Sequence, residues 1–237
     1  MTDRFLEGRL ALVTGASRGI GAATAEALAA AGAHVVLTAR TAAGLEAVEE
    51  RIDAAGGTAT IAPLDLTDGD SIARLAAAVG GRWDALDVLV LNAATLGSLA
   101  AVPAIDGKEF ARVLTLNVVA QQALIAGFDP MLRNSDAARL IAITSSVAQR
   151  PRAYWGAYGA SKAALENLVL SYADEVSNAT PIRAAIVNPG PTATVMRARA
   201  FPGEDPASLK EPADVAEAIV GLLRAGFESG HRLGLPR

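Results

Sequence analysis

Three glycines between a short apolar run and a helical pattern constrain this chain more than any other feature. Residues 9–14 are largely apolar and predict a buried strand, residues 19–31 predict a helix, and Gly15, Gly19 and Gly21 lie where the two meet. Glycine lets the backbone turn sharply and approach a pyrophosphate, whose charge the free N–H groups and the positive end of the helix dipole would bind. The spacing predicts a dinucleotide-binding strand-turn-helix unit, with a glycine-rich connector that binds no ligand as the alternative.

The same alternation continues along the chain. Five further apolar runs of strand length lie at residues 33–39, 58–64, 85–91, 139–144 and 182–187, and a weaker strand signal lies at residues 231–235. Helical patterns include residues 42–55, 71–79, 107–133 and 213–225. Six strands alternating with helices predict one α/β domain over residues 1–237, a doubly wound parallel sheet of six to seven strands with helices on both faces. Ligands of such sheets bind at the carboxyl ends of the strands.

Composition narrows the class of protein. Hydrophobic residues make up 51% of the 237 residues and aromatic residues only 4%, so Ala, Val, Leu and Ile fill the core, as suits a buried parallel sheet. The absence of cysteine excludes disulfides and thiolate sites, and His34 and His231 lie far apart, so we expect no metal. A net charge of −4 gives no basic field for nucleic acid. With no signal peptide, and with charges, Gly or Pro interrupting every apolar run, we expect a cytoplasmic protein without a membrane partner.

The residues after the second strand bear on the choice of dinucleotide. An acidic side chain there would bind the ribose 2′-hydroxyl of NAD, whereas a basic one suits the 2′-phosphate of NADP. Arg40 follows this strand, Arg18 lies nearby in the glycine turn, and no acidic residue stands at the strand end. We therefore expect NADP(H) to be favoured over NAD(H), with two merely solvated arginines as the alternative.

Two further strand ends offer residues to the same ligand. Asp65 and Leu66 follow the third strand, where Asp65 is placed to bond an adenine amine, and Thr67 or Asp68 is a candidate cap for the next helix. Asn92-Ala93-Ala94 ends the fourth strand. Small residues there would let a cofactor approach, and we expect Asn92 to brace backbone between strands rather than touch substrate.

A tyrosine and a lysine four residues apart carry the predicted chemistry. Tyr158 and Lys162 lie in a helical stretch, and residues at this spacing share a helix face about 5–6 Å apart at Cβ. A fixed ammonium favours the phenolate, so Tyr158 could exchange a proton with a substrate oxygen, although the same pair occurs on many solvated helices. Ser145 and Ser146 end the preceding strand, and Asn117 interrupts an apolar helical run, as a local structural bond or a site residue.

Six motifs, in this order and spacing, resemble the short-chain dehydrogenase/reductase family. They are Thr14-Gly15-x-x-x-Gly19-Ile20-Gly21, Asn92-Ala93-Ala94, Asn117, Ser145-Ser146, Tyr158-x-x-x-Lys162 and Asn188-Pro189-Gly190. The resemblance covers residues 6–225, and residues 199–206 are also similar to a bacterial branch of NADP-linked oxidoreductases with poorly defined substrates. It implies a Rossmann fold and an oxidoreductase that acts on carbonyl or alcohol groups of small molecules.

The resemblance also implies a role for each matching residue. Tyr158 would be the general acid and base, Lys162 would lower its pKa and bind the nicotinamide ribose, and Asn117 would hold a water of a proton relay. A serine would hydrogen-bond the substrate oxygen. Contacts to the cofactor would come from Gly15, Ser17, Arg18, Gly19, Ile20, Gly21, Arg40, Asp65, Leu66, Asn92, Ala93, Ala94, Tyr158, Lys162, Pro189, Gly190, Thr192 and Thr194. Nothing in the pattern calls for a metal.

The sequence departs from the family pattern in three places. Ser146 lies 12 residues before Tyr158, one fewer than usual, yet it directly precedes Val147-Ala148 as in the family. We favour Ser146 as the catalytic serine, with Ser145 as the alternative. Asn92-Ala93-Ala94 stands where Asn-Asn-Ala-Gly is commoner. The missing Asp-Gly-Gly ending puts a seventh strand in doubt and favours a homodimer, with a tetramer as the alternative.

The leading functional hypothesis is an NADP-dependent carbonyl reductase or alcohol dehydrogenase. The alternatives are an NAD-linked alcohol dehydrogenase, a dinucleotide-binding sensor without turnover, and an epimerase or dehydratase with a tightly held cofactor. Residues 192–211 have no clear period and predict a flexible flap over the site or a surface loop. Tyr154, Trp155, Met196 and Phe201 could form an apolar wall for a hydrophobic substrate, or pack the flap or a dimer partner.

Overall fold

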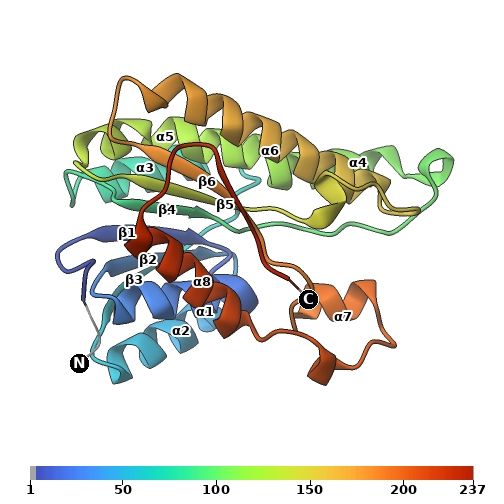
Figure 1. Ribbon diagram of the computed structural model, residues 1–237, viewed down its shortest axis with the longest axis horizontal. Helices are drawn as coiled ribbons and strands as arrows, with labels where there is room; N and C mark the ends of the chain where they lie inside the picture. Colours follow the sequence, from blue (N-terminus) through green and yellow to red (C-terminus); the bar gives the residue numbers. More distant parts are fainter. Residues whose placement is uncertain (1–3, 237) are drawn as a thin grey trace.

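Seven parallel strands form one sheet between two layers of helices in the computed structural model, which describes residues 4–236 (Figure 1). The strands are β1 (Leu10–Thr14), β2 (His34–Ala39), β3 (Thr58–Pro63), β4 (Val88–Leu91), β5 (Arg139–Ile143), β6 (Arg183–Asn188) and β7 (His231–Gly234). Their order is β3-β2-β1-β4-β5-β6-β7, with every pair parallel. The predicted doubly wound sheet is confirmed, and the strand order reverses between β1 and β4, where ligands of this architecture bind. Residues 1–3, which open the stretch used for the signal-peptide prediction, lie outside the described residues.

Helices cover both faces of the sheet. One face carries α1 (Gly19–Ala30), α2 (Ala42–Ala54) and α8 (Pro212–Ala225), which lie below the sheet in Figure 1. The other carries α3 (Ser71–Gly80), α5 (Ala120–Asn134) and α6 (Gly156–Ser177), with α4 (Gly107–Leu114) beside the start of α6. Each layer encloses its own apolar core against the sheet.

The alternation of side chains along β1 joins the two cores. Leu10 and Leu12 pack with the α3, α5 and α6 layer, whereas Ala11 and Val13 pack with the α1, α2 and α8 layer. Every residue of β1 is buried, because a central parallel strand is covered on both faces. Each large apolar side chain buried in this way contributes about 1.5–3 kcal/mol, so the strands are held firmly and their carboxyl ends form a rigid base for polar side chains.

The helical region predicted over residues 107–133 is interrupted by a π-helical turn, η2 (Thr115–Val119). Turns of this type are rare and frequently lie at functional sites. The combined run Gly107–Asn134 is long and apolar enough to cross a membrane by length and composition, although Arg112 and Gly127 interrupt its apolar stretch as predicted. Its residues Leu124 and Leu132 are fully buried in the core described above, which is the behaviour of a core helix.

The segment of residues 192–211, here called the flap, has more regular structure than its sequence predicts. It contains a short helix, α7 (Val195–Ala200), which the Thr194 side chain caps. The Ala193 N–H donates to the Lys210 carbonyl at 2.8 Å, so the two ends of the flap are joined. In Figure 1 the flap projects beside the C-terminal end of the chain. A six-residue helix is too short to give a period that sequence reasoning detects.

The seventh strand, which the sequence left in doubt, is present. β7 pairs in parallel with β6, with His231 opposite Ala185 and Gly234 opposite Asn188. It is a mostly exposed edge strand, paired through its backbone, and only Leu233 packs partly against the core. The doubt is therefore corrected, and the missing family motif does not remove the strand.

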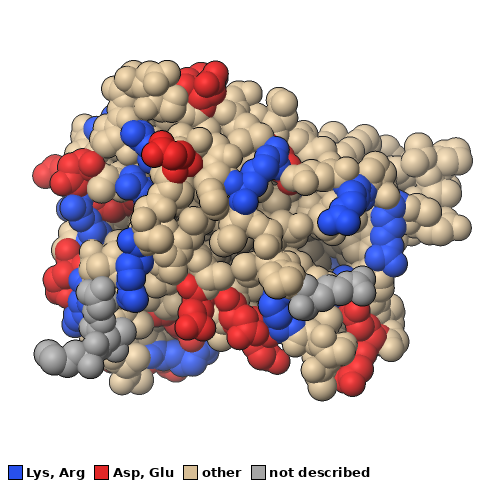
Figure 2. Space-filling model, viewed as in Figure 1, with Lys and Arg blue, Asp and Glu red and all other residues tan. Residues whose placement is uncertain are grey.

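Charged side chains of both signs are interspersed over the face in Figure 2. The loop before α4 projects at the right of Figures 1 and 2 and is uncharged, because residues 93–105 contain no Asp, Glu, Lys or Arg. No single sign dominates this face, which gives no support for an extended polyanionic partner there.

Candidate active site

The glycine turn is shaped for close backbone approach. Gly15 has φ +66°, which strains any residue with a side chain, and a Cβ there would lie 2.9 Å from Asn92 Nδ2. A Cβ on Gly21 would lie 2.3 Å from the Gly15 carbonyl oxygen. Asn92 Nδ2 donates to the Thr14 carbonyl at 2.8 Å and to the Gly15 carbonyl at 3.3 Å. The predicted bracing role of Asn92 is confirmed, and only glycine fits at the two glycine positions.

The amino end of α1 is open to an anion. Arg18 is its N-cap residue, yet no side chain caps the helix and its first turn has no acidic residue. The first N–H groups of a helix have no partner within the helix, and the helix dipole favours negative charge beside them. A Cβ on Gly19 would lie 3.4 Å from Thr194 Cγ2, so the turn lies against the start of the flap. This set of donors fits the pyrophosphate of a dinucleotide.

Arg40 and Asp65 lie at the carboxyl ends of the neighbouring strands β2 and β3. Arg40 is exposed, and Leu66 beside Asp65 is buried. Hydrogen bonds from the Thr67 N–H at 2.9 Å and hydroxyl at 2.7 Å lower the pKa of the Asp65 carboxyl, with a smaller contribution from the Arg40 charge. The predicted cap by Thr67 or Asp68 is wrong, because no side chain caps α3 and Thr67 bonds to Asp65 instead.

Tyr158 and Lys162 are buried one turn apart at the start of α6, against the end of β5. Their exposed fractions are 7% and 2%. The Ser145 side chain hydrogen-bonds Tyr158, and Lys162 Nζ donates to the Ile143 carbonyl at 2.8 Å. Ser145 continues the extended backbone of β5 with φ −158°, whereas Ser146 opens an exposed 3₁₀ turn. Of the two candidate serines, Ser145 is the one whose side chain meets Tyr158.

Burial shifts both ionisable groups toward their neutral forms. It raises the pKa of Tyr158 to about 12, opposed by the hydrogen bond with Ser145. It lowers the pKa of Lys162 to about 8, opposed by the negative charge of Glu166. Lys162 Nζ lies 5.9 Å from the centre of the Tyr158 ring. The expected lowering of the tyrosine pKa is not found because burial dominates, and Tyr158 is a phenol at neutral pH, ready to donate a proton.

Asn117 lies in the π turn and anchors α6. It is fully buried, its Oδ1 accepts from the Thr95 N–H at 2.8 Å, and its Nδ2 donates to the Thr95 carbonyl at 2.9 Å. Nδ2 also donates to Ser161 Oγ at 2.9 Å, and Ser161 Oγ donates to the Tyr158 carbonyl at 2.7 Å. The amide therefore ties the loop after β4 to the turn of α6 that carries the tyrosine and the lysine.

An apolar and aromatic wall flanks Tyr158. The Trp155 ring lies edge-on to the Tyr158 ring at 6.0 Å and 5.5 Å from the Phe201 ring of the flap. Met196 of α7 packs against the same cluster. Tyr154 does not join the wall, because it is 63% exposed, and it holds an unusual backbone φ of 71°. Three of the four residues predicted for this wall are thus brought together, and the flap packs on them.

The loop after β6 forms the rigid turn expected from its prolines. Gly190 has φ +66°, and its N–H donates to Asn188 Oδ1 at 3.2 Å. Thr192 is buried, and its hydroxyl lies 3.4 Å from the Pro189 carbonyl and 3.3 Å from the Gly190 carbonyl.

Over residues 4–236, no group of three or more His, Asp or Glu side chains could hold a metal ion.

The family model for short chain dehydrogenases matches residues 9–205. The chain belongs to the short-chain dehydrogenase family. It is 36% identical over 234 residues to the uncharacterized oxidoreductase YciK of Escherichia coli. The aligned residues cover 98% of this chain and 91% of that protein. A short chain dehydrogenase from Pseudomonas syringae superposes with a TM-score of 0.94 at 39% identity, over 98% of this chain and 96% of that one. Another from Shigella flexneri, solved as a complex with NADP, has a TM-score of 0.93 at 35% identity over 99% of both chains.

Membership of this family makes the chain an NAD(P)-dependent dehydrogenase or reductase. Sequence reasoning missed five polar residues near its site, namely Thr144, Gln149, Ser161, Glu166 and Arg232. Ser161 lies inside the Tyr-x-x-x-Lys motif, and Glu166 is a lone charge among apolar residues one turn after the lysine, so both had a signal in the sequence. Arg232 had none, because only the pairing of β7 with β6 brings it near α6.

Proposed function

We propose that this short-chain dehydrogenase transfers hydride between NADP(H) and a carbonyl or secondary alcohol group, with Tyr158 as the general acid and base. The observation that carries the proposal is the buried Tyr158 hydroxyl bonded to Ser145, with the Lys162 ammonium one helical turn away. These groups converge at the carboxyl edge of the sheet, where ligands of this fold bind.

Tyr158 and Ser145 would act on the same substrate oxygen. In the direction of reduction, the bound cofactor supplies a hydride to the carbonyl carbon. The electron pair of the C=O bond moves onto the oxygen, Ser145 donates a hydrogen bond to that oxygen, and Tyr158 transfers its phenolic proton to it, which gives the alcohol. The negative charge left on Tyr158 is stabilised by the Lys162 ammonium. Oxidation of an alcohol runs the same steps in reverse.

The cofactor would lie along the carboxyl ends of the central strands. Its pyrophosphate fits the glycine turn and the start of α1, formed by Gly15, Ser17, Arg18, Gly19, Ile20 and Gly21. Asp65 and Leu66 would flank the adenine, and Asn92, Ala93 and Ala94 the middle of the cofactor. Its nicotinamide end would meet Lys162, Pro189, Gly190, Thr192 and Thr194. Asn117 would orient the catalytic helix and support a water-linked proton relay to Lys162.

NADP(H) would be favoured over NAD(H). Arg40 and Arg18 are both exposed, at the end of β2 and in the glycine turn, where the 2′-phosphate would need positive charge. The relative from Shigella flexneri was solved with NADP, which agrees with this choice. The Asp65 carboxylate accepts hydrogen bonds from the Thr67 N–H and hydroxyl, so it competes less with the 2′-phosphate for these arginines.

The wall of Trp155, Met196 and Phe201 suits a substrate whose carbonyl carries a hydrophobic or aromatic group. We expect a homodimer formed through α6, with a tetramer as the alternative. Charges of both signs are mixed on the face in Figure 2, which suits a small-molecule partner rather than nucleic acid. We also expect the enzyme to work in the cytoplasm.

Nucleotide titration followed by fluorescence tests the cofactor proposal, and NADPH consumption with a panel of aldehydes and ketones tests the reaction. NADPH should bind at least tenfold more tightly than NADH, and Arg40→Ala should remove most of this preference. Arg74→Ala, an exposed arginine on α3, is the matched control and should leave both affinities unchanged. Equal affinities in the wild type would exclude the 2′-phosphate role of Arg40, and the absence of turnover with every carbonyl would exclude the reductase.

A further inference from the structure

Three consecutive residues at the end of β5 bond to three residues spaced one turn apart along α6. The pairs are Ser145 with Tyr158, Ile143 with Lys162 at 2.8 Å, and Thr144 with Glu166 at 2.7 Å. The proposed function uses the first two pairs and leaves the third without a role. Since positions four apart share one face of a helix, Glu166 extends the line of catalytic side chains by one turn.

Glu166 is a buried carboxylate with a full set of donors. Its side chain is 6% exposed, and it accepts from the Thr144 hydroxyl at 2.7 Å and from Gln149 Nε2 at 3.1 Å. Arg232 of β7 donates to it at 2.5 Å. A buried charge is tolerated only when it is paired and hydrogen-bonded, so this constellation holds Glu166 ionised beside α6.

We infer that Glu166, held by Arg232, is a positioning residue that keeps the neighbouring Lys162 ammonium charged. The inference rests on the proposed function, in which that ammonium stabilises the tyrosine after proton transfer. It also gives the C-terminal strand a role in the site, because Arg232 reaches the catalytic helix only through the pairing of β7 with β6.

The groups around Lys162 make the electrostatic effect specific. Tyr158 and Glu166 of its own helix lie one turn to either side of it, and Glu166 is the charge that raises its pKa, with Arg232 bonded to Glu166. Neither η2 nor the 3₁₀ turn Ser146–Ala148 contains an ionisable residue. The other elements packed on α6 carry charges farther from Lys162, at Lys108, Glu109 and Arg112 of α4, Asp129 and Arg133 of α5, and Arg139 and Arg183 at the opposite ends of β5 and β6.

Two variants should therefore move the Lys162 titration in opposite directions. Glu166→Gln removes the negative charge that favours the ammonium, so the pKa of Lys162 should fall by about 1 unit or more. Arg232→Met leaves Glu166 ionised through its bonds from Thr144 and Gln149 and removes the positive charge that offsets it, so the same pKa should rise, by about half a unit. A merely structural role for either residue would not produce shifts of opposite sign.

The chain is well suited to this measurement, because it has only three lysines, Lys108, Lys162 and Lys210. NMR titration of protein labelled with ¹³C at lysine Cε gives three signals, and Lys162→Met assigns the one of interest. Asp174→Asn, which removes an exposed carboxylate from the same helix, is the matched control and should leave the curve unchanged. Arg232→Lys should restore the wild-type curve at least in part. If Glu166→Gln does not fold, the Arg232→Met variant still tests the inference: a rise in the Lys162 pKa supports it and a fall overturns it.

Turnover gives a second readout. The alkaline limb of kcat/KM for carbonyl reduction should move to lower pH in Glu166→Gln and to higher pH in Arg232→Met. Unchanged Lys162 titration in both variants, or shifts of the same sign, would overturn the inference. A wild type that reduces no carbonyl would overturn the proposed reaction instead, and the NMR titration would still test the role of Glu166.

Discussion

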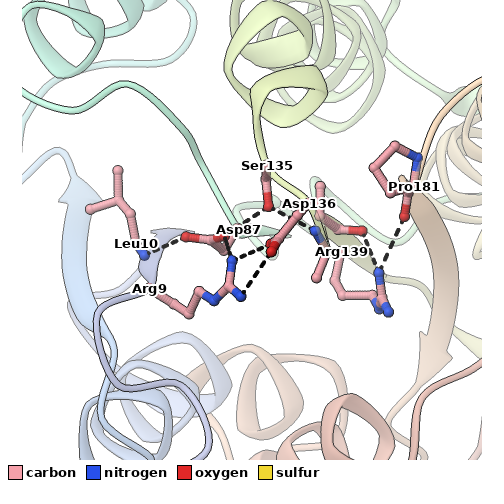
Figure 3. A network of polar contacts seen from close by, with 9 residues as sticks. Arg9, Leu10, Asp87, Ser135, Asp136, Arg139 and Pro181 are labelled. Atoms are coloured by element: carbon pink, nitrogen blue, oxygen red, sulfur yellow. Dashed lines mark hydrogen bonds and ion pairs between the residues drawn. The ribbon is translucent and has the colours of Figure 1, made fainter.

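Buried carboxylates stand at both edges of the sheet, and their surroundings differ. At the amino-terminal edge, Asp87 accepts from the Leu10 N–H at 2.8 Å, the Ser135 hydroxyl at 2.7 Å and Arg9 Nη1 at 3.0 Å (Figure 3). Arg9 also pairs with Asp136. These partners come from the start of a strand and from connecting loops, so this network fastens strand beginnings to one another.

At the carboxyl edge, the carboxylate of Glu166 is bonded just as fully but stands one turn from Lys162. There burial moves the pKa of Tyr158 up and the pKa of Lys162 down. The contrast teaches that one sheet uses buried polar groups in two ways. Those at the amino edge stabilise the fold, whereas those at the carboxyl edge give up stability and, in the proposed function, hold groups ready for proton transfer.

Among the residues that distinguish the two edges, Lys162→Met should have the largest effect and lower kcat about a thousandfold. The pKa of Lys162 is about 8 in the folded chain against 10.5 as reference, so the folded state binds this proton less tightly than the unfolded state. Its burial therefore costs most stability below pH 8, and the cost fades as pH rises from 8 to 10.5. The variant should be more stable than the wild type at pH 7, by roughly 1–2 kcal/mol, and lose this advantage by pH 10.5.

Urea denaturation at several pH values measures this difference, with Lys108→Met on the surface as the control. A stability advantage of the variant that grows between pH 8 and pH 10.5 would contradict the account.

Asp87→Ala should have the next largest effect, and on stability alone. It leaves the Leu10 N–H, the Ser135 hydroxyl and Arg9 without their acceptor, so the free energy of unfolding should fall by about 3 kcal/mol. Turnover per folded molecule should stay at the wild-type level. Asp84→Ala, an exposed neighbour, is the control for denaturation. A loss of kcat larger than the loss of folded protein would break the division between the two edges.

Ser145→Ala should lower kcat about a hundredfold, because it removes one hydrogen-bond donor to the reacting oxygen. Ser146→Ala should stay within a factor of two, since Ser146 is exposed and opens a turn. Steady-state kinetics on both variants compares two adjacent serines in one background. The reverse order of effects would restore the preference drawn from the sequence.

Asp136→Asn should have the smallest effect, with no measurable change in stability or turnover. Asp136 pairs with Arg9 at the surface, where solvent screens the charges, and Arg9 keeps its bond to Asp87. Thermal unfolding with and without about 0.5 M salt, which shortens the Debye length to about 4 Å, measures the contribution of this surface pair to stability. A clear loss of stability would mean that the amino-edge network extends to the surface.

Much of the fold was predictable because its signals are local. Gly15 is required by its positive φ and Gly21 by its close contact with the Gly15 carbonyl, and the buried strands have continuous apolar runs. The parts that failed depend on geometry a pattern does not contain. β7 takes its place largely from backbone pairing, with Leu233 as its one half-buried apolar side chain, and α7 is too short to show a period.

The site was predictable to the level of motifs but not of atoms. Tyr158 and Lys162 lie together as their spacing requires, whereas the choice between Ser145 and Ser146 depends on where an extended backbone becomes a 3₁₀ turn. The sign of the tyrosine pKa shift depends on burial, which the sequence does not give. Contacts between distant elements, such as Arg232 of β7 with Glu166 of α6, join residues far apart in the chain, and no local sequence pattern predicts them.

The central claim is that Tyr158 donates the proton while the rest of the site binds the cofactor, and Tyr158→Phe tests it most directly. NADPH affinity by fluorescence and NADPH consumption with a carbonyl substrate would be measured on the same preparations. We predict wild-type affinity for NADPH and a loss of turnover of about a thousandfold or more. A variant that binds NADPH and keeps more than a tenth of the wild-type turnover would contradict the account.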